Sequence, residues 1–336
     1  MKNFLPSCMI CCMILVSGLK LNAQFESFLW ATRVGGTFPE ESSSIGVDAS
    51  GNIYTTGFYR GTVDFNQGAG VFNLSSNTST WYDAYVTKVD ASGNFLWAKS
   101  IGGSLNDIPS GLVIDNLGNV IITGLFTGAV DFDPGAPLYA ITAAGSEDIF
   151  VWKLDASGNF VWAKNFGGAS NEKGNAIATD ATGNIYTTGV FNSTCDFDPS
   201  GVAYNLVAAA QDIFVSKLDA SGNFVWAKKM GGTANDVGYS SKLDASNNVY
   251  ISGSFETTAD FDPGAPTVNM VAVALRDIFV SKLDNAGNYT WVKTMGGTGN
   301  EHGYGITIDG LGNVLCTAIL FGGPIKHEKK WLDMNT

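Results

Sequence analysis

The sequence contains very little histidine and cysteine. Only two histidines occur among 336 residues, His302 and His327, so neither a histidine general base nor a multi-histidine zinc site can be assembled. Three of the five cysteines lie within the first 12 residues. The other two, Cys195 and Cys316, stand at non-equivalent positions, which excludes a disulfide scaffold. We interpret them as small apolar residues, with a single disulfide as the alternative.

Long apolar runs are absent after the N-terminus, so we expect no membrane span in the mature chain. Residues 1–23 have the pattern of a cleaved secretory signal. Lys2 precedes an apolar stretch from Met9 to Val16, and Leu21-Asn22-Ala23 fits a signal-peptidase site. We therefore expect a protein that is exported through the periplasm and is then secreted or held at the cell surface.

Basic residues are outnumbered, with 19 Lys and Arg against 31 Asp and Glu, which gives a net charge of −12. Removing Lys2 and Lys20 with the signal leaves 31 acidic and 17 basic residues, or −14. Such a chain repels phosphate backbones, so we expect no nucleic-acid partner. Acidity instead suits cation binding or simply solubility.

One eleven-residue phrase recurs four times, as in GNFVWAKNFGG from Gly158. Its tryptophan is one of five that are spaced 64 to 67 residues apart along the sequence: Trp30, Trp97, Trp162, Trp226 and Trp291. A turn phrase, D-x-x-G-N, keeps the same period and occurs twice per unit. It begins at Asp48, Asp90, Asp115, Asp155, Asp180, Asp219, Asp284 and Asp309, with a variant at Asp244. Because the tryptophans and the turn phrase share the same spacing, they establish an internal repeat of about 65 residues.

Each turn is flanked by alternating runs of β-branched and aromatic residues, so each unit predicts two hairpins, or four strands that we call a, b, c and d. A four-stranded blade cannot bury its two apolar faces alone, and stacking such blades buries both. The sequence therefore predicts an all-β fold, a β-propeller, with the d-strand tryptophan packed between blades. A β-solenoid is the alternative, although its repeats are usually shorter.

The unit count predicts four complete blades, which begin near Ser43, Ser110, Asn175 and Tyr239, and a split, incomplete fifth. Strand d of the fifth would come from the N-terminus, strands a and b from the C-terminus, and strand c is missing. We assign residues 24–322 to the propeller. Residues 323–336 form an atypical tail, because Ala318 replaces the usual glycine and the D-F-D segment is gone. We interpret this ending as truncation, by a frameshift or a split gene.

The units GNIYTTGFYRGTVDF and DAYVTKVDASGNFLWAKSIGG, with their later copies, resemble the SBBP β-propeller repeat of secreted bacterial proteins. The resemblance covers roughly residues 25–321. It implies a propeller fold and an extracellular setting but no particular reaction. Similar proteins exported by type IX secretion often end in a sorting domain, which this sequence lacks.

The loops between strands b and c are long, and long loops on rigid scaffolds often carry function. They contain paired or single carboxylates, which we treat as candidate ligand-binding residues: Asp64, Asp131, Asp133, Asp196, Asp198, Asp260 and Asp262. The six paired ones, from Asp131 to Asp262, are candidate Ca²⁺ ligands, because hard oxygen donors suit that ion. The alternative is that these aspartates cap their own turns.

The connections between strand d and the next strand a contain a repeated polar step: Asn106/Asp107, Asn171/Glu172, Asn235/Asp236 and Asn300/Glu301. Two interpretations stay open for it. The step lines a ligand-binding face, or it caps the backbone of the neighbouring blade.

These observations predict a secreted, non-catalytic binding or scaffolding module, without a cofactor and monomeric, whose ligand is a glycan or an extracellular protein. A carboxylate-based polysaccharide hydrolase or lyase is the first alternative, although a catalytic pair should be unique and these pairs recur. A truncated fragment without independent function is the second.

Overall fold

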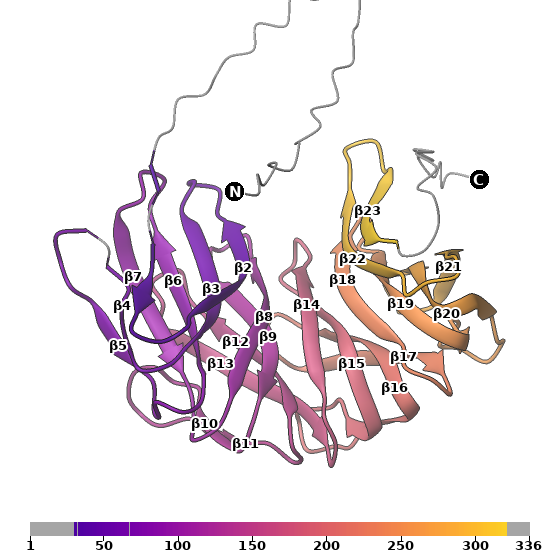
Figure 1. The fold of residues 1–336 in the computed structure, drawn as a ribbon, viewed down its shortest axis with the longest axis horizontal. Coiled ribbons are helices and arrows are strands. Elements are labelled where there is room, and N and C mark those ends of the chain that lie inside the picture. The colour runs from indigo at the N-terminus through magenta and orange to yellow at the C-terminus, as the bar shows by residue number, and fades with distance from the viewer. Residues whose placement is uncertain (1–29, 32, 67, 321–336) are drawn as a thin grey trace, which may run out of the picture. The chain divides into compact units, whose positions relative to one another are not determined.

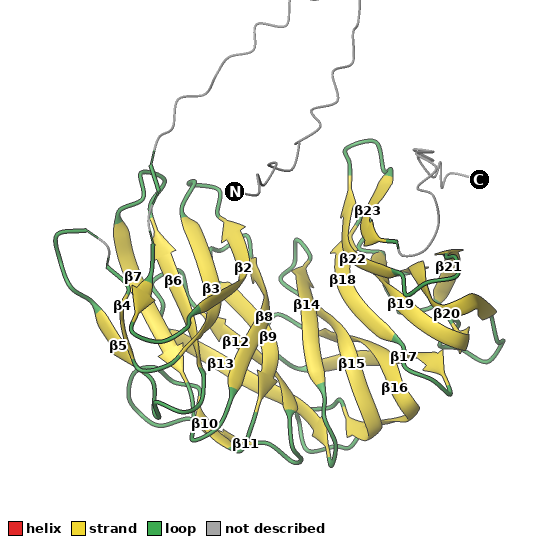
Figure 2. Cartoon of the chain, in the orientation of Figure 1, coloured by secondary structure: helices red, strands yellow, loops and turns green. Residues whose placement is uncertain are grey.

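The computed structural model describes residues 30–31, 33–66 and 68–320. Contacts divide the chain into Met1–Ala31 and Thr32–Thr336, and every strand lies in the second unit. The described residues form strands, turns and loops without a helix (Figure 2). No described segment is therefore a helix that could cross a membrane.

Four four-stranded antiparallel sheets follow one another along the chain, each paired in the order a-b-c-d (Figure 1). The first contains β2 (Glu41–Val47), β3 (Ile53–Tyr59), β6 (Asp83–Val89) and β7 (Phe95–Ile101). The second contains β8 (Asp107–Ile114), β9 (Val120–Phe126), β12 (Asp148–Leu154) and β13 (Phe160–Gly168). The third contains β14 (Lys173–Thr179), β15 (Ile185–Asp196), β16 (Asn205–Leu218) and β17 (Phe224–Gly232). The fourth contains β18 (Val237–Leu243), β19 (Val249–Asp260), β20 (Asn269–Leu283) and β21 (Tyr289–Met295).

Shorter strands complete the architecture. A two-stranded sheet of β22 (His302–Ile308) and β23 (Val314–Ile319) follows the fourth sheet. The b–c loops of the first two sheets carry their own short strands: β4 (Thr62–Asp64), β5 (Asn73–Ser75), β10 (Ala129–Asp131) and β11 (Ala140–Thr142). The predicted all-β repeat fold, with its four a–d units and an a–b hairpin, is confirmed, and the fold is β-propeller-like.

The D-x-x-G-N phrases form tight turns. At Asp155, Oδ1 accepts the backbone N–H groups of Ser157 (2.8 Å) and Asn159 (2.9 Å), and Oδ2 accepts the Asn159 side-chain amide. Gly158 takes a φ of 81°, a left-handed conformation that favours glycine. The same bonds recur in the other turns, with Asn247 at 63° in the variant. The turn interpretation is confirmed.

The Gly-Gly pair that ends the repeated phrase is required by two close approaches. A Cβ on Gly167 would lie 2.1 Å from the carboxyl carbon of Asp148, and one on Gly168 would lie 2.0 Å from the carbonyl oxygen of Thr194. Gly167 and Gly168 pair with Asp196 and Cys195 at the end of β15. The glycines therefore let strand d of one sheet hydrogen-bond to strand b of the next.

Aromatic and aliphatic side chains fill the spaces between neighbouring sheets. One core cluster joins Tyr54 and Val86 of the first sheet to Leu112 and Trp152 of the second. Trp97 packs partly buried against this cluster, and its indole N–H donates to the carbonyl of Ala156 at 3.4 Å. The predicted packing role of the d-strand tryptophan is confirmed.

A lysine in strand c links consecutive sheets on the side of the D-x-x-G-N turns. Lys153 Nζ lies 3.2 Å from Asp115 Oδ2 in the a–b turn of its own sheet. It also donates to the carbonyl of Ala220, in the c–d turn of the third sheet, at 3.3 Å. The two side chains are only 6% and 4% exposed, so the pair is largely removed from water.

Half of the predicted strand d at the N-terminus, residues 25–29 and 32, falls outside the described residues. Its described final glycines form β1 (Gly35–Gly36), which pairs with β4 just as later Gly-Gly steps pair with the following sheet. Among residues 302–320, only the β22–β23 pairing is present, and Ala318 stands opposite Gly303. The signal segment 1–23 and the tail 323–336 also lie outside the described residues.

Candidate functional site

The candidate aspartates of the b–c loops are bound within their own loops. Asp196 Oδ1 accepts the backbone N–H groups of Asp198 (3.0 Å) and Tyr204 (2.8 Å), and Asp198 Oδ1 accepts that of Ser200 (2.9 Å). Equivalent bonds occur in the other loops, at Asp64, Asp131, Asp133, Asp260 and Asp262. These carboxylates therefore hold the shape of the loops, as the turn interpretation predicts.

The structure keeps the carboxylates of different b–c loops apart. No three acidic, histidine or cysteine side chains of the described residues gather as a metal group. Asp260 and Asp262 lie beside a cavity of about 280 Å³, together with Tyr204 and Lys228 of the third sheet. Cys195 is buried with a free thiol, and Cys316 is also free.

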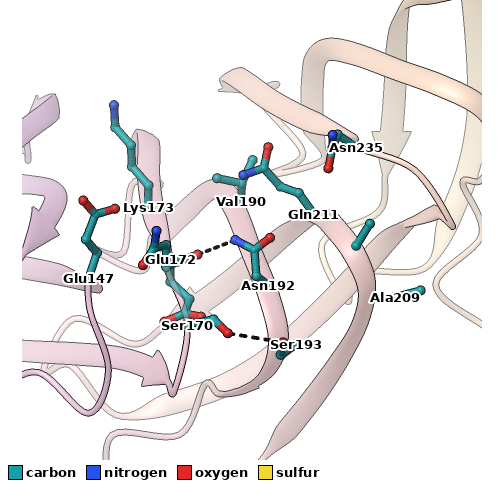
Figure 3. Close-up of a pocket in the computed structure, with 12 residues that line it drawn as sticks. Glu147, Ser170, Glu172, Lys173, Val190, Asn192, Ser193, Ala209, Gln211 and Asn235 are labelled. Carbon is teal, nitrogen blue, oxygen red and sulfur yellow. Dashed lines mark hydrogen bonds between the residues drawn. The ribbon is translucent and has the colours of Figure 1, made fainter.

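A pocket of about 710 Å³ lies between the second and third sheets (Figure 3). It opens at the end of the sheets that carries the b–c loops and the d–a connections. Its walls are mostly side-chain amides, hydroxyls and charged groups: Glu147, Ser170, Asn171, Glu172, Lys173, Asn192, Ser193, Gln211 and Asn235. Such walls offer many hydrogen-bond donors and acceptors.

Backbone strain occurs at the rim of this pocket. Ser193 has a φ of 54° at a bulge where β15 shifts its register against β16. The corresponding residues of the first two sheets are Gly61 and Gly128, which adopt positive φ without a side-chain penalty. Serine here costs conformational energy but adds a hydroxyl, and Ser170 Oγ donates to Ser193 Oγ at 3.2 Å.

A buried carboxylate pair lies next to the pocket. Asp148 begins β12 and Glu172 precedes β14, and both are fully buried. Burial raises the pKa of Glu172 to about 7, with the negative charge of Asp148 adding to the effect. Burial also raises the pKa of Asp148, although hydrogen bonds from Ala144 and Asn165 oppose the shift.

The same pair occurs at each junction between sheets: Asp83/Asp107, Asp148/Glu172, Asp212/Asp236 and Asp277/Glu301. The polar step predicted from the sequence contains the second member of each pair, but the first member was not predicted. A sequence pattern marks this first member, because an aspartate always precedes the apolar run of strand c, as in DAYV and DIFV. Recurrence of the pair in every junction indicates a structural role for the fold.

The capping interpretation of the polar step is confirmed, whereas the ligand-binding interpretation stays a prediction. The acidic member caps backbone, since Glu172 Oε2 accepts the N–H of Gly168 at 3.2 Å and Asp236 Oδ2 accepts that of Gly232 at 2.7 Å. Asn106 caps backbone as well, since its Oδ1 accepts the N–H of Tyr82 at 3.1 Å, while Asn171, Glu172 and Asn235 line the pocket.

The fold defines a β-propeller-like repeat protein. No family model matches the chain. It is 25% identical over 270 residues to an uncharacterized WD repeat-containing protein of Acanthamoeba polyphaga mimivirus, covering 69% of this chain and 19% of that protein. It is 26% identical over 162 residues to the regulatory protein FlaEY of Caulobacter vibrioides, covering 46% of this chain and 16% of FlaEY. The chain thus spans about a fifth or less of these curated relatives. A solved Bacteroides caccae protein of unknown function is 9% identical, with a TM-score of 0.34, covering 76% of this chain and 82% of that one.

Proposed function

We propose that this protein is a secreted, non-catalytic binding module that holds a polar ligand, a glycan or a segment of an extracellular protein. The observation that carries the proposal is the pocket of about 710 Å³ between the second and third sheets. Similarity to a WD repeat-containing protein supports an interaction module in coarse terms. The signal-like N-terminus supports export.

The chemistry of the pocket supports a ligand rich in hydroxyl or amide groups. Gln211, half-buried, and Asn235, exposed, each present an amide that can donate and accept hydrogen bonds. Apolar lining is limited to Val190 and two alanines, so shape and hydrogen bonding rather than hydrophobic burial would select the ligand. Carboxylate pairs that recur at every junction weigh against the hydrolase alternative.

The test is a glycan array, backed by a panel of secreted proteins, followed by calorimetry on any hit. Gln211→Ala and Asn235→Ala should each weaken binding about fivefold, because each removes a hydrogen bond worth about 1 kcal/mol. Asn116→Ala is the matched control, since this exposed amide lies in an a–b turn at the other end of the sheets. Binding that ignores both pocket variants, or that falls equally with the control, would refute the proposed site.

A further inference from the structure

The junction between the first and second sheets contains a group of buried oxygen atoms. Asp83 begins β6 and is 2% exposed, and Asp107 begins β8 and is fully buried. The Asp83 carboxyl is pressed against strand d of the same sheet, because a Cβ on Gly102 would lie 2.1 to 2.5 Å from its atoms. Tyr59, also fully buried, lies near Asp83 and Ser100.

The oxygen atoms of this group are incompletely paired. Asp83 Oδ2 accepts the N–H of Asn77 at 2.9 Å, but its Oδ1 is buried and has no hydrogen-bond partner among the described residues. Asp107 is bound by the N–H groups of Gly103 and Thr127. Neither carboxylate forms an ion pair within the described part of the chain. Burial raises the pKa of Asp83 to about 7 and that of Asp107 to about 8.

In the third repeat, the position equivalent to Ser100 is occupied by a basic residue. The residue two positions before the Gly-Gly step is Ser100, Asn165, Lys229 and Thr294 in successive repeats. Lys229 Nζ lies 2.7 Å from Oδ2 of the fully buried Asp212, which corresponds to Asp83. At this junction the protein therefore places a positive charge of its own on the carboxylate pair.

We propose that the first junction is a binding site for a hard metal cation, held by Asp83 and Asp107 with the hydroxyls of Ser100 and Tyr59. Serine is the shortest side chain found at the Lys229 position, so it leaves the most room, and its hydroxyl is a suitable ligand. Carboxylate and hydroxyl oxygens suit Ca²⁺ or Na⁺ better than softer metals. Two carboxylates give few charges, so a Ca²⁺ affinity in the range of about 10⁻⁴–10⁻³ M is expected, as in extracellular modules.

The test is thermal unfolding of the full chain at pH 8, in EDTA and then in 10 mM CaCl₂, with calorimetry for stoichiometry. Ca²⁺ should raise the Tm by roughly 3 °C at a tenfold excess over Kd. Ser100→Lys should raise the Tm in EDTA and abolish the Ca²⁺ response, because its ammonium takes the place of the ion. Lys229→Ser should lower the Tm in EDTA and add a second Ca²⁺ site. This variant tests the proposal independently if Ser100→Lys does not fold.

A matched control separates this site from the b–c loops. The triple variant Asp133→Asn, Asp198→Asn and Asp262→Asn keeps the amide oxygens that can cap the loops, and it should respond to Ca²⁺ as the natural chain does. Three outcomes would overturn the proposal. These are a natural chain that ignores Ca²⁺ at pH 8, a folded Ser100→Lys variant that still responds, or loss of the response in the triple variant.

Discussion

Replacing Lys153 with methionine tests how strongly the c-strand lysines hold the sheets together. Methionine keeps most of the apolar stem, so the change removes chiefly the charge and the polar contacts of the ammonium. Asp115, 3.2 Å from the ammonium and 4% exposed, would lose its counter-charge. The bond to the carbonyl of Ala220 in the next sheet would be lost as well.

The size of the effect follows from burial. Removing one partner from a buried ion pair costs about 3–5 kcal/mol. Asp115 keeps hydrogen bonds from Leu117 and Asn119, which lower the cost of leaving its charge behind. We therefore expect a loss near the lower limit, about 3 kcal/mol. Urea unfolding followed by tryptophan fluorescence should show a midpoint lower by about 1 M, with the slope unchanged.

The fourth repeat provides the matched control. Lys282 occupies the same position and lies 3.4 Å from Asp244 Oδ2, but these side chains are 18% and 20% exposed. Water screens this pair more, so Lys282→Met should cost about 1 kcal/mol or less. Equal losses for Lys153→Met and Lys282→Met would show that burial of the ion pair does not set the stability, and the reasoning would fail.

Three further predictions concern pH and backbone. Burial raises the pKa of Asp236 to about 7, and the negative charges of Asp212 and Glu256 add to the shift. Protonation of Asp236 therefore contributes stability that is fully present below about pH 4 and is lost as the pH rises towards 7. Asp236→Asn should flatten that slope in melts from pH 4 to 8, and an unchanged slope would contradict the assignment. Gly167→Ala should destabilise by about 3 kcal/mol, whereas Gly310→Ala, with open space around it, should be near neutral in the same urea assay. Thr257→Gly should stabilise by about 1 kcal/mol, because φ is 53° there, and a lower Tm would count against strain.

The sequence predicted the local structure well because hairpin signals are local. Asp, Gly and Asn at fixed offsets in D-x-x-G-N determine the turn, and alternating apolar residues determine the strands around it. The period of about 65 residues then indicated the sheet as the repeating unit. The hydrogen bonds within the turns therefore follow from the sequence alone.

The pocket and the junction pairs could not be predicted in the same way. Asp148 and Glu172 are 24 positions apart, and only the pairing of strands from two sheets brings them together. Gly167 makes room for the Asp148 carboxyl, because a Cβ there would lie 2.1 Å from its carboxyl carbon. Contacts of this kind depend on the tertiary fold, so the pattern within one repeat contains no direct sign of them.

Pairing between strand d and the next strand b means that the structural units are interlocked. Gly167 and Gly168 hydrogen-bond with residues of the third sheet, and Gly231 and Gly232 do so with the fourth, so sheets two to four form one continuous ladder. Amide hydrogen exchange should therefore show shared protection across these boundaries rather than one stability for each sheet. Duplication of a repeat must preserve both sides of this strand pairing. This explains why the Gly-Gly step and the aspartate that pairs with it in the next strand b recur together.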